Sequence, residues 1–285
     1  MDDPAVSVVI PTRNRAAYLD VTLGSLAGQR GGPVHEVLII DDASADATAA
    51  VVARWGVRHE RHEHALGLNG ARNAGVRHAR APLIAFLDDD VLVPSGWLRA
   101  LAQGAAAHPS AEAFGGAIRA RLEGRPPSSC GREEPPITTL DLGSEDRQAP
   151  MVWGANMAIR RRAFERYGLF DEAIAGHGDE EDWLLALRAA GGQIVYLAAA
   201  AVEHRRAAPD ARLLPLARAA YHRGCAARVT DERRGTEPGL LGELRTVAGC
   251  AWHTVHFACP QGVIMGAHST GRLAEALRRR RVASR

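Results

Sequence analysis

The sequence predicts an α/β fold in which a mostly parallel central sheet is covered by helices on both faces. Short apolar runs, such as residues 6–10 and 83–87, alternate with helical segments along most of the chain, as strands and helices do in parallel sheets. Several of these runs are followed directly, at their carboxyl ends, by clusters of polar residues. The chain has 285 residues, 46% of them hydrophobic, which is enough for a substantial core.

The expected elements follow one another from the amino terminus. Pro11 ends the first apolar run, and Leu19, Leu23 and Leu26 then share one helical face. The expected strands cover residues 6–10, 37–40, 57–60, 83–87, 113–120, 157–159 and 194–202. Further helices are expected near residues 46–55, 70–80, 97–107, 161–167 and 179–190.

The middle and the end of the chain have different patterns. Residues 121–150 contain several prolines and little periodicity, so we expect a long surface loop there. Beyond about residue 210 the pattern is helical and rich in arginine. One late helical face is apolar, and packing on the core is its favoured interpretation, ahead of a homodimer interface or contact with a membrane surface. This face contains Val247, Ala251, Val255 and Ala258.

Composition excludes several classes of protein. All 35 basic residues are arginine, so a P-loop with its lysine is absent, and no GxGxxG follows the first strand. The net charge of +2 gives no reason to expect a nucleic-acid partner. The amino terminus does not have the pattern of a secretory signal, which favours a cytoplasmic protein, with the inner face of the membrane as an alternative. The cysteines have no paired ligand spacing and we expect reduced thiols without assigned chemistry: Cys130, Cys225, Cys250 and Cys259.

Three polar clusters stand at the ends of expected strands, where ligands bind in open α/β sheets. They are residues 12–15 (Thr-Arg-Asn-Arg), Asp41 with Asp42, and residues 88–90 (Asp-Asp-Asp). For the second cluster, a turn or helix cap is as good an interpretation as a binding site. Three adjacent carboxylates repel one another, so a divalent cation completed by a substrate diphosphate is favoured for the third.

Other polar motifs carry weaker signals. Arg72 lies among glycines at a helix start, where a guanidinium can pair with phosphate. Residues 176–183 (Gly-His-Gly-Asp-Glu-Glu-Asp-Trp) place four acids at a helix start, and one of them is a candidate general base. For residues 59–64, with three histidines, a solvated loop is favoured over a metal site. By pattern alone His204 is a core or edge histidine.

Taken together, five motifs in this order resemble glycosyltransferase family 2 over residues 5–205. They are Val8–Asn14, Val37–Ser44, Gly67–Gly75, Phe86–Asp90, and Gly154–Asn156 ahead of Glu181–Trp183. The resemblance implies the GT-A fold and an inverting, metal-dependent transfer. It also implies a catalytic domain over residues 1–206, with a nucleotide-binding half (1–120) and an acceptor-binding half (121–206), and a helical extension over residues 207–285.

The resemblance implies a role for each matching residue. Asp182 would be the catalytic base with Glu181 beside it, although Glu180 or Glu181 is the alternative base because the acidic run has four members. Asp90 and His204 would hold Mn²⁺ or Mg²⁺. The nucleotide would contact Pro11, Thr12, Arg13, Asn14, Asp42, Arg72, Asp88 and Asp89, with no specific role for Asp89. The donor sugar and acceptor would contact Trp153, Gly154, Asn156 and Trp183.

The expected reaction is a single transfer from a nucleoside-diphosphate sugar to a hydroxyl of a natural product or cell-surface glycan. UDP or dTDP is favoured because the carboxylate of Asp42 suits the N3 hydrogen of uracil or thymine. The QxxRW sequence and membrane spans of the processive synthases are missing from this sequence. The alternatives are a non-catalytic module that binds nucleotide-sugar and, with less support, a sugar nucleotidyltransferase.

Overall fold

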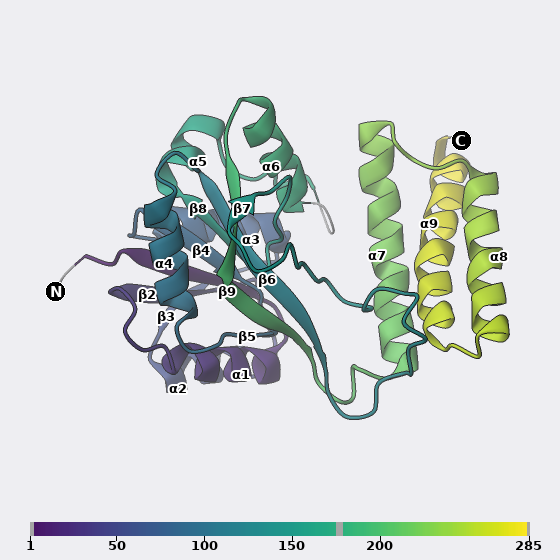
Figure 1. The fold of residues 1–285 in the computed structure, drawn as a ribbon, viewed down its shortest axis with the longest axis horizontal. Helices are drawn as coiled ribbons and strands as arrows, with labels where there is room; N and C mark the ends of the chain where they lie inside the picture. Colours follow the sequence, from purple (N-terminus) through teal and green to yellow (C-terminus); the bar gives the residue numbers. More distant parts are fainter. Residues whose placement is uncertain (1–2, 175–178, 284–285) are drawn as a thin grey trace. The chain divides into compact units, whose positions relative to one another are not determined.

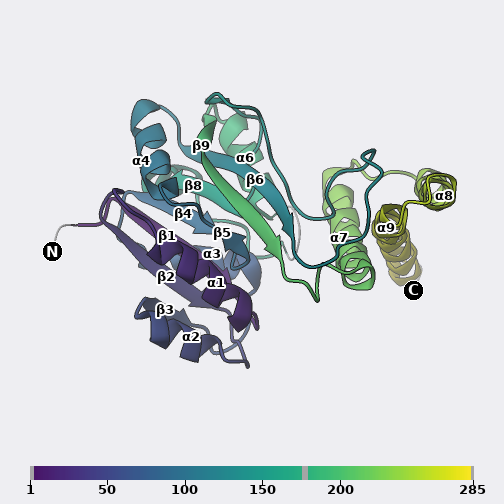
Figure 2. The ribbon, with the colours of Figure 1, turned by 60° about the horizontal axis from the view of Figure 1, so that its bottom comes forward.

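The computed structural model describes residues 3–174 and 179–283. Within this part of the chain one nine-stranded sheet forms, in the order β3-β2-β1-β4-β8-β6-β9-β5, with β7 paired to β9 (Figures 1 and 2). The strands are β1 (Val6–Thr12), β2 (His35–Asp41), β3 (Arg58–Arg61), β4 (Leu83–Leu87), β5 (Val91–Leu92), β6 (Ala113–Leu122), β7 (Arg147–Gln148), β8 (Asn156–Arg160) and β9 (Ile194–Arg206).

Helices cover both faces of this sheet. They are α1 (Ala16–Ala27), α2 (Thr48–Trp55), α3 (Gly67–His78), α4 (Trp97–Ala107), α5 (Arg161–Tyr167) and α6 (Asp179–Ala189). Side chains alternate along a strand, so Val8 and Ile10 pack with α1, α2 and α4, whereas Val9 packs with α3, α5 and α6. Both faces of β1 are therefore apolar, which explains its uninterrupted hydrophobic run.

The predicted fold class is confirmed, and the structure adds the direction of each strand. Strands β3, β2, β1 and β4 are parallel neighbours. The pairings of β4 with β8, β6 with β8, β5 with β9 and β7 with β9 are antiparallel. The sheet therefore has a parallel amino-terminal half that continues into antiparallel strands, a change that apolar runs alone cannot reveal.

The long surface loop expected over residues 121–150 is largely irregular and exposed, but strand pairing divides it. Ile118 and Leu140 form an isolated antiparallel bridge, β7 pairs with β9, and Ala149 is buried. Residues 139–150 group with the sheet, while residues 121–138 group with the carboxy-terminal residues 206–285 in a second compact unit. Prolines and low periodicity indicated irregular backbone correctly, but they carry no signal for long-range pairing.

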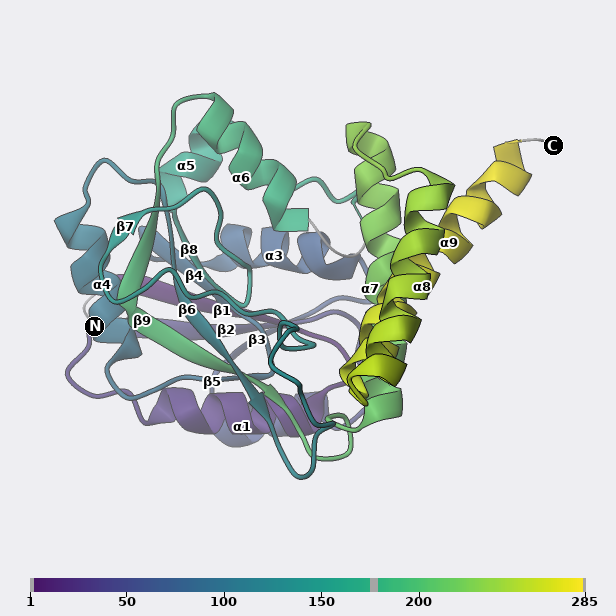
Figure 3. The ribbon, with the colours of Figure 1, turned by 45° about the vertical axis from the view of Figure 1, so that its right-hand side comes forward.

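The second unit contains α7 (Leu213–Arg234), α8 (Leu240–His256) and α9 (Gln261–Ala283), which lie side by side (Figures 1 and 3). Glycines allow close approach: a Cβ atom at Gly224 would collide with the backbone of His268, and one at Gly271 with the backbone of Tyr221. A Cβ at Gly262 would likewise collide with Thr254 of α8. Small residues thus bring α9 against both neighbouring helices.

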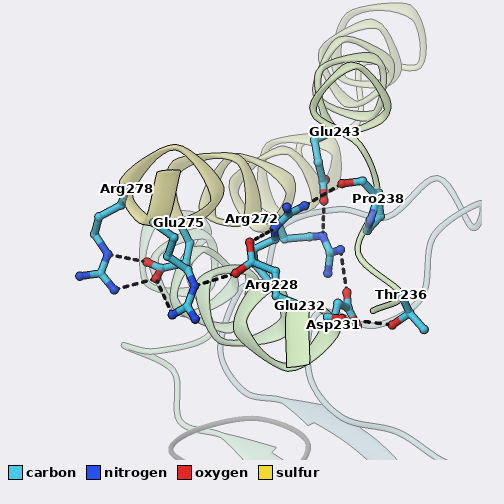
Figure 4. Close-up of polar contacts among 10 residues, drawn as sticks. Arg228, Asp231, Glu232, Thr236, Pro238, Glu243, Arg272, Glu275 and Arg278 are labelled. Carbon is cyan, nitrogen blue, oxygen red and sulfur yellow. Dashed lines mark hydrogen bonds and ion pairs between the residues drawn. The ribbon is translucent and has the colours of Figure 1, made fainter. Parts of the chain in front are cut away.

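Ion pairs join the same three helices (Figure 4). Arg272 Nε lies 2.6 Å from Glu243 Oε1 and Arg272 Nη2 lies 2.7 Å from Asp231 Oδ2. Arg228 donates to Glu232 and to the carbonyl of Pro238, both at 2.7 Å. Because Arg228 and Glu243 are buried, loss of one partner would leave an uncompensated buried charge.

The apolar face of α8 was expected to pack on the core, and this interpretation was wrong. Val255 is 83% exposed, Ala251 and Ala258 are also exposed, and Val247 is half-buried. The buried side chains of α8 are instead Glu243 and Cys250, because contact with α9 uses glycines and ion pairs. In the described residues, no helix is long and apolar enough to cross a membrane.

Candidate active site

The three aspartates occupy the turn between β4 and β5, and neighbouring strands fix this turn. Thr12, at the end of β1, donates from Oγ1 to Asp89 Oδ2 at 2.7 Å. The hydroxyl of Thr22 in α1 lies 2.8 Å from the Asp89 carbonyl oxygen, and the amide of Arg205 in β9 donates to the Asp90 carbonyl at 2.8 Å. Asp89, which had no specific role by sequence, ties the turn to β1.

Asp88, Asp90 and His204 bring one ligand atom each within 4.8 Å of one another. His204 arrives there because β9 pairs with β5 in the register that sets His204 opposite Val91. His204 Nε2 lies 3.2 Å from Asp90 Oδ1, and both side chains are buried. Two carboxylates and an imidazole suit Mn²⁺ or Mg²⁺, so the donor set fits the cation that the sequence predicts.

The electrostatics of the turn favour a bound cation. Burial raises the pKa of Asp88, and the charge of Asp90 raises it further, while Arg72 and His204 lower it. Burial also raises the pKa of Asp89 to about 7, against the opposing charge of Arg15. Crowded, desolvated carboxylates are stabilised in the ionised form by any cation that joins them.

Arg15 belongs to this site; the sequence placed it in the polar cluster of residues 12–15 but assigned it no role. Its guanidinium lies 2.6 Å from Asp90 Oδ2 through Nη2 and 3.2 Å from Asp89 Oδ1 through Nη1. Burial lowers the pKa of Arg15, but the charges of Asp90 and Asp89 raise it more, so the pKa lies above its usual value. The signal in the sequence was its place in the polar cluster after β1, but spacing does not tell which member of the cluster points inward.

Asp42 forms hydrogen bonds to the loop before α3. Its carboxylate accepts from the amides of Leu66 (2.8 Å) and Gly67 (3.0 Å), and His62 Nδ1 lies 2.9 Å from Asp42 Oδ1. Burial raises the pKa of Asp42, but the contact with His62 and the two amides lower it more, so the net shift is downward. Residues 59–64 were expected to form a solvated loop rather than a metal site; residues 63 and 64 are exposed, but His62 is 12% exposed and contacts Asp42.

Arg72, Gly154 and Glu180 form a second buried group. Glu180 Oε2 lies 3.3 Å from Arg72 Nη1, and Glu180 Oε1 accepts from the amide of Gly154 at 2.9 Å. A Cβ atom at Gly154 would collide with the Arg72 guanidinium, so glycine is required for this close approach. The structure thus brings together three predicted motifs that lie far apart in sequence.

Helix α6 carries the remaining acids of the predicted base motif. Glu181 and Asp182 are half-buried in its first turn, whereas Gly176–Gly178 of the motif lie outside the described residues. Trp183 is buried against Phe164 and Phe170, with ring centroids 5.1 and 5.6 Å away, and its Nε1 donates to the Gly168 carbonyl at 2.8 Å. Trp183 therefore anchors α6 in the core, and its predicted contact with substrate stays a prediction.

Asn156 has a similar interior position. Its Nδ2 donates to the Ala200 carbonyl at 2.7 Å, and its Oδ1 accepts from Trp97 Nε1 at 3.0 Å. The amide therefore holds β8 to β9 and α4, and its predicted contact with the sugar stays a prediction. Trp153 is half-buried beside it.

The other predicted nucleotide-binding residues lie where β1 ends. Pro11 is buried and Arg13 is exposed. Asn14 adopts a left-handed backbone conformation with φ of 54°. Its backbone N–H donates to Ser44 Oγ at 2.9 Å, and its side-chain Oδ1 accepts from the backbone N–H of Ala45 at 2.7 Å. It thereby joins the loop after β1 to the loop after β2.

Comparison with known families and proteins identifies relatives of this chain. Residues 7–168 match the model of the family described as glycosyl transferase family 2. A pre-mycofactocin glycosyltransferase from Mycobacterium tuberculosis is 33% identical over 235 residues, which cover 78% of this chain and 47% of that protein. A validoxylamine A glucosyltransferase from Streptomyces hygroscopicus subsp. limoneus is 32% identical over 209 residues, 62% of this chain and 46% of that protein. The chain therefore spans about half the length of these relatives.

Solved structures share the fold at low sequence identity. The mannosyltransferase PcManGT from Pyrobaculum calidifontis, in complex with GDP-Man and Mn²⁺, has a TM-score of 0.60 and 17% identity, over 96% of this chain and 70% of that one. GalNAc-T7 with UDP, GalNAc and Mn²⁺ has a TM-score of 0.59 and 17% identity, over 80% of this chain and 51% of that one.

Proposed function

This chain belongs to glycosyl transferase family 2 and is a glycosyltransferase, and we propose that it performs an inverting, metal-dependent, non-processive transfer. The donor is a nucleoside-diphosphate sugar, with UDP or dTDP favoured, and the acceptor is a hydroxyl group. The observation that carries the proposal is the convergence of Asp88, Asp90 and His204 beside the ends of β1 and β4. In open α/β sheets this edge is where nucleotides bind.

Asp90 and His204 hold the divalent cation in this proposal. When bound, the cation neutralises charge on the departing diphosphate. Asp88 faces the ribose, and Asp89 keeps the turn in place through Thr12 and Arg15. This division assigns the three adjacent aspartates to three different tasks.

The base of the nucleotide lies near Pro11, Thr12 and Asp42. Asp42 Oδ2 accepts one backbone hydrogen bond, from Gly67, and a carboxylate oxygen has two lone pairs. A second bond, from N3–H of uracil or thymine, is compatible with this arrangement. Arg13 and Asn14 border the same strand end.

Arg72 is directed to the diphosphate side of the site. Its ion pair with Glu180 keeps the guanidinium in a buried position, and a fixed cation there stabilises developing negative charge without reorganisation. Both oxygens of Glu180 have partners, Arg72 and the Gly154 amide. Glu180 is therefore a positioning residue in this proposal, which leaves Glu181 and Asp182 for acid–base chemistry.

Asp182 removes the proton from the acceptor hydroxyl as the oxygen attacks the anomeric carbon in line with the leaving diphosphate. One displacement of this kind inverts the configuration at that carbon. Glu181 lies beside it toward the acceptor, with Trp153 and Gly154 on the sugar side. Residues 1–120 supply the nucleotide half and residues 121–206 the acceptor half.

The names of two relatives support one class of acceptor. One relative is named for validoxylamine A and the other for pre-mycofactocin, and neither name mentions a glycan. We propose an acceptor of the natural-product class, ahead of a cell-surface glycan.

Calorimetry tests the donor site. Titration of UDP, dTDP and GDP into the full chain, with and without Mn²⁺, is expected to show metal-dependent binding that Asp90→Ala removes. Glu181→Gln is the matched control and is expected to bind like the wild type. Metal-independent affinity that Asp90→Ala leaves unchanged would contradict the proposed metal site.

A further inference from the structure

A second cluster of potential metal ligands lies in the unit that contains α7, α8 and α9. Cys130, Glu133, His253 and Cys259 each offer one ligand atom, and these atoms lie within 4.8 Å of one another. Cys130 and Glu133 come from the segment 121–138, His253 from the last turns of α8, and Cys259 from the connection to α9. This cluster has no part in the proposed transfer reaction.

Four distances within the cluster, measured to one or the other oxygen of Glu133, are 3.0–3.8 Å, close to those around one tetrahedral ion. Cys130 Sγ lies 3.0 Å from Glu133 Oε2 and 3.5 Å from His253 Nε2. Cys259 Sγ lies 3.3 Å from Glu133 Oε1, and His253 Nε2 lies 3.8 Å from Glu133 Oε2. Tetrahedral bonds of about 2.0–2.3 Å place ligand atoms about 3.3–3.8 Å apart. The four side chains therefore need small adjustments to share one ion.

The local backbone supports this convergence. Gly131, with φ of 77°, makes the turn between Cys130 and Glu133, and the amides of Cys130 and Arg132 donate to the Glu133 carboxylate at 3.1 Å each. Ala258 has φ of 47°, a conformation that costs energy for a residue with a Cβ atom. This turn lies between the end of α8 and Cys259.

We propose that Cys130, Glu133, His253 and Cys259 bind one Zn²⁺ ion with a structural role. Two thiolates, an imidazole and a carboxylate are ligand types that zinc accepts, and four protein ligands leave no open position for a substrate. The spacing Cys-x₂-Glu followed by His-x₅-Cys gives two pairs of ligands, as in many structural zinc sites. On binding, Cys130 and Cys259 each release a proton to solvent.

The cluster is partly buried: Cys259 is a buried residue, and Cys130, Glu133 and His253 are half-buried. The side chain of Glu133 is 3% exposed and that of His253 is 12% exposed, and Cys259 is 2% exposed. Arg132, next to Glu133 in sequence, places its guanidinium 4.4 Å from the centroid of the Phe257 ring. A buried carboxylate between two thiols and an imidazole is stabilised by a cation in their midst.

The segment that this ion would hold has little apolar packing of its own. All of residues 121–138 are described, and Ile137 is the one buried apolar residue among them. Polar contacts add to the attachment: Gln261 donates to the Pro127 carbonyl at 3.4 Å and Arg223 to the Pro136 carbonyl at 2.7 Å. Zinc would therefore supply the fixed point that joins this segment to α8 and α9.

Metal analysis tests the proposal directly. The full chain, purified without chelators, is expected to contain about one tightly bound zinc ion per molecule by plasma mass spectrometry. Cys130→Ser and Cys259→Ser are expected to lose it. Cys225→Ser and Cys250→Ser replace the other two cysteines and are matched controls that retain zinc. Retention of zinc by Asp90→Ala separates this ion from one at the candidate active site.

Cobalt substitution gives a second readout that needs no variant. Tetrahedral Co²⁺ with thiolate ligands is expected to show intense sulfur-to-metal charge-transfer bands and visible bands, whereas the site of Asp88, Asp90 and His204 contains no sulfur. The proposal is overturned if the wild-type chain binds neither zinc nor cobalt with these bands. It is equally overturned if an intact-mass measurement shows a disulfide between Cys130 and Cys259 in the chain as purified under reducing conditions.

Discussion

The cluster of Asp88, Asp90 and His204 and the cluster of Cys130, Glu133, His253 and Cys259 both bring their ligand atoms within 4.8 Å of one another. The first has two carboxylates and one imidazole at a strand end, with room in its coordination for substrate oxygens. The second has two thiols and four protein ligands in all. In our proposals, similar spacing serves two purposes: one cluster binds a metal that arrives with a substrate, and the other binds a metal that holds the chain together.

Metal removal is expected to separate the two sites most clearly. Brief treatment with EDTA followed by gel filtration should lower sugar transfer by about 10⁴-fold, since a catalytic cation supplies several kcal/mol, while about one zinc ion stays bound. Transfer assays and metal analysis of the same sample measure both effects. Added Mn²⁺ should restore transfer. If zinc is lost together with activity, the two clusters do not differ in how tightly they hold their metal ions.

Removal of the proposed catalytic base should leave both proposed metal sites intact. Asp182→Asn is expected to lower kcat by about 10³-fold, within the range for a lost general base, with UDP and Mn²⁺ affinity unchanged. Kinetics and calorimetry measure the two quantities. Glu181→Gln is the control with a smaller loss. If Glu181→Gln loses more activity than Asp182→Asn, Glu181 is the base.

The buried ion pair between Arg72 and Glu180 should contribute to stability as well as to catalysis. Glu180→Ala leaves the buried Arg72 guanidinium without this partner, and we expect a loss of about 3 kcal/mol in the free energy of unfolding. Urea denaturation measures it, with Glu181→Ala as the half-buried control. An equal, small loss in both variants would show that the ion pair contributes little to the free energy of unfolding.

The exposed face of α8 should be the least sensitive region. Val255→Glu is expected to change the free energy of unfolding by less than about 0.5 kcal/mol, because the side chain is largely in solvent. Thermal unfolding and size-exclusion chromatography check this, with Ala220→Glu in α7 as a buried contrast. A large loss of stability, or a change in oligomeric state, would show that another surface covers this face.

Several parts of the fold were predictable because they depend on local pattern. The bounds expected for the strand at residues 83–87 and the helix at residues 97–107 agree with β4 and α4. The resemblance to glycosyltransferase family 2 was confirmed by the match over residues 7–168. The antiparallel strands, the division of residues 121–150 and the exposed face of α8 were missed, because they depend on pairing between distant segments.

The proposed zinc ligand set shows the same limit of prediction from sequence. The cysteines received no chemistry because none stands in a CxxC pair. The ligands occur instead as Cys-x₂-Glu and His-x₅-Cys, with Glu133 and Cys259 126 positions apart in the sequence. A search for mixed pairs of Cys, His and Glu would have found both halves, but not their convergence.

The sequence by itself determined the alternation of strands and helices, the carboxylates at the end of β4 and the family to which the chain belongs. Each of these features depends on residues that are close together in the sequence. Tertiary structure alone decided which distant side chains meet. Arg15 reaches Asp90 across 75 positions and Arg72 reaches Glu180 across 108. Such contacts depend on strand register and on the rotation of each helix, which a one-residue shift would change.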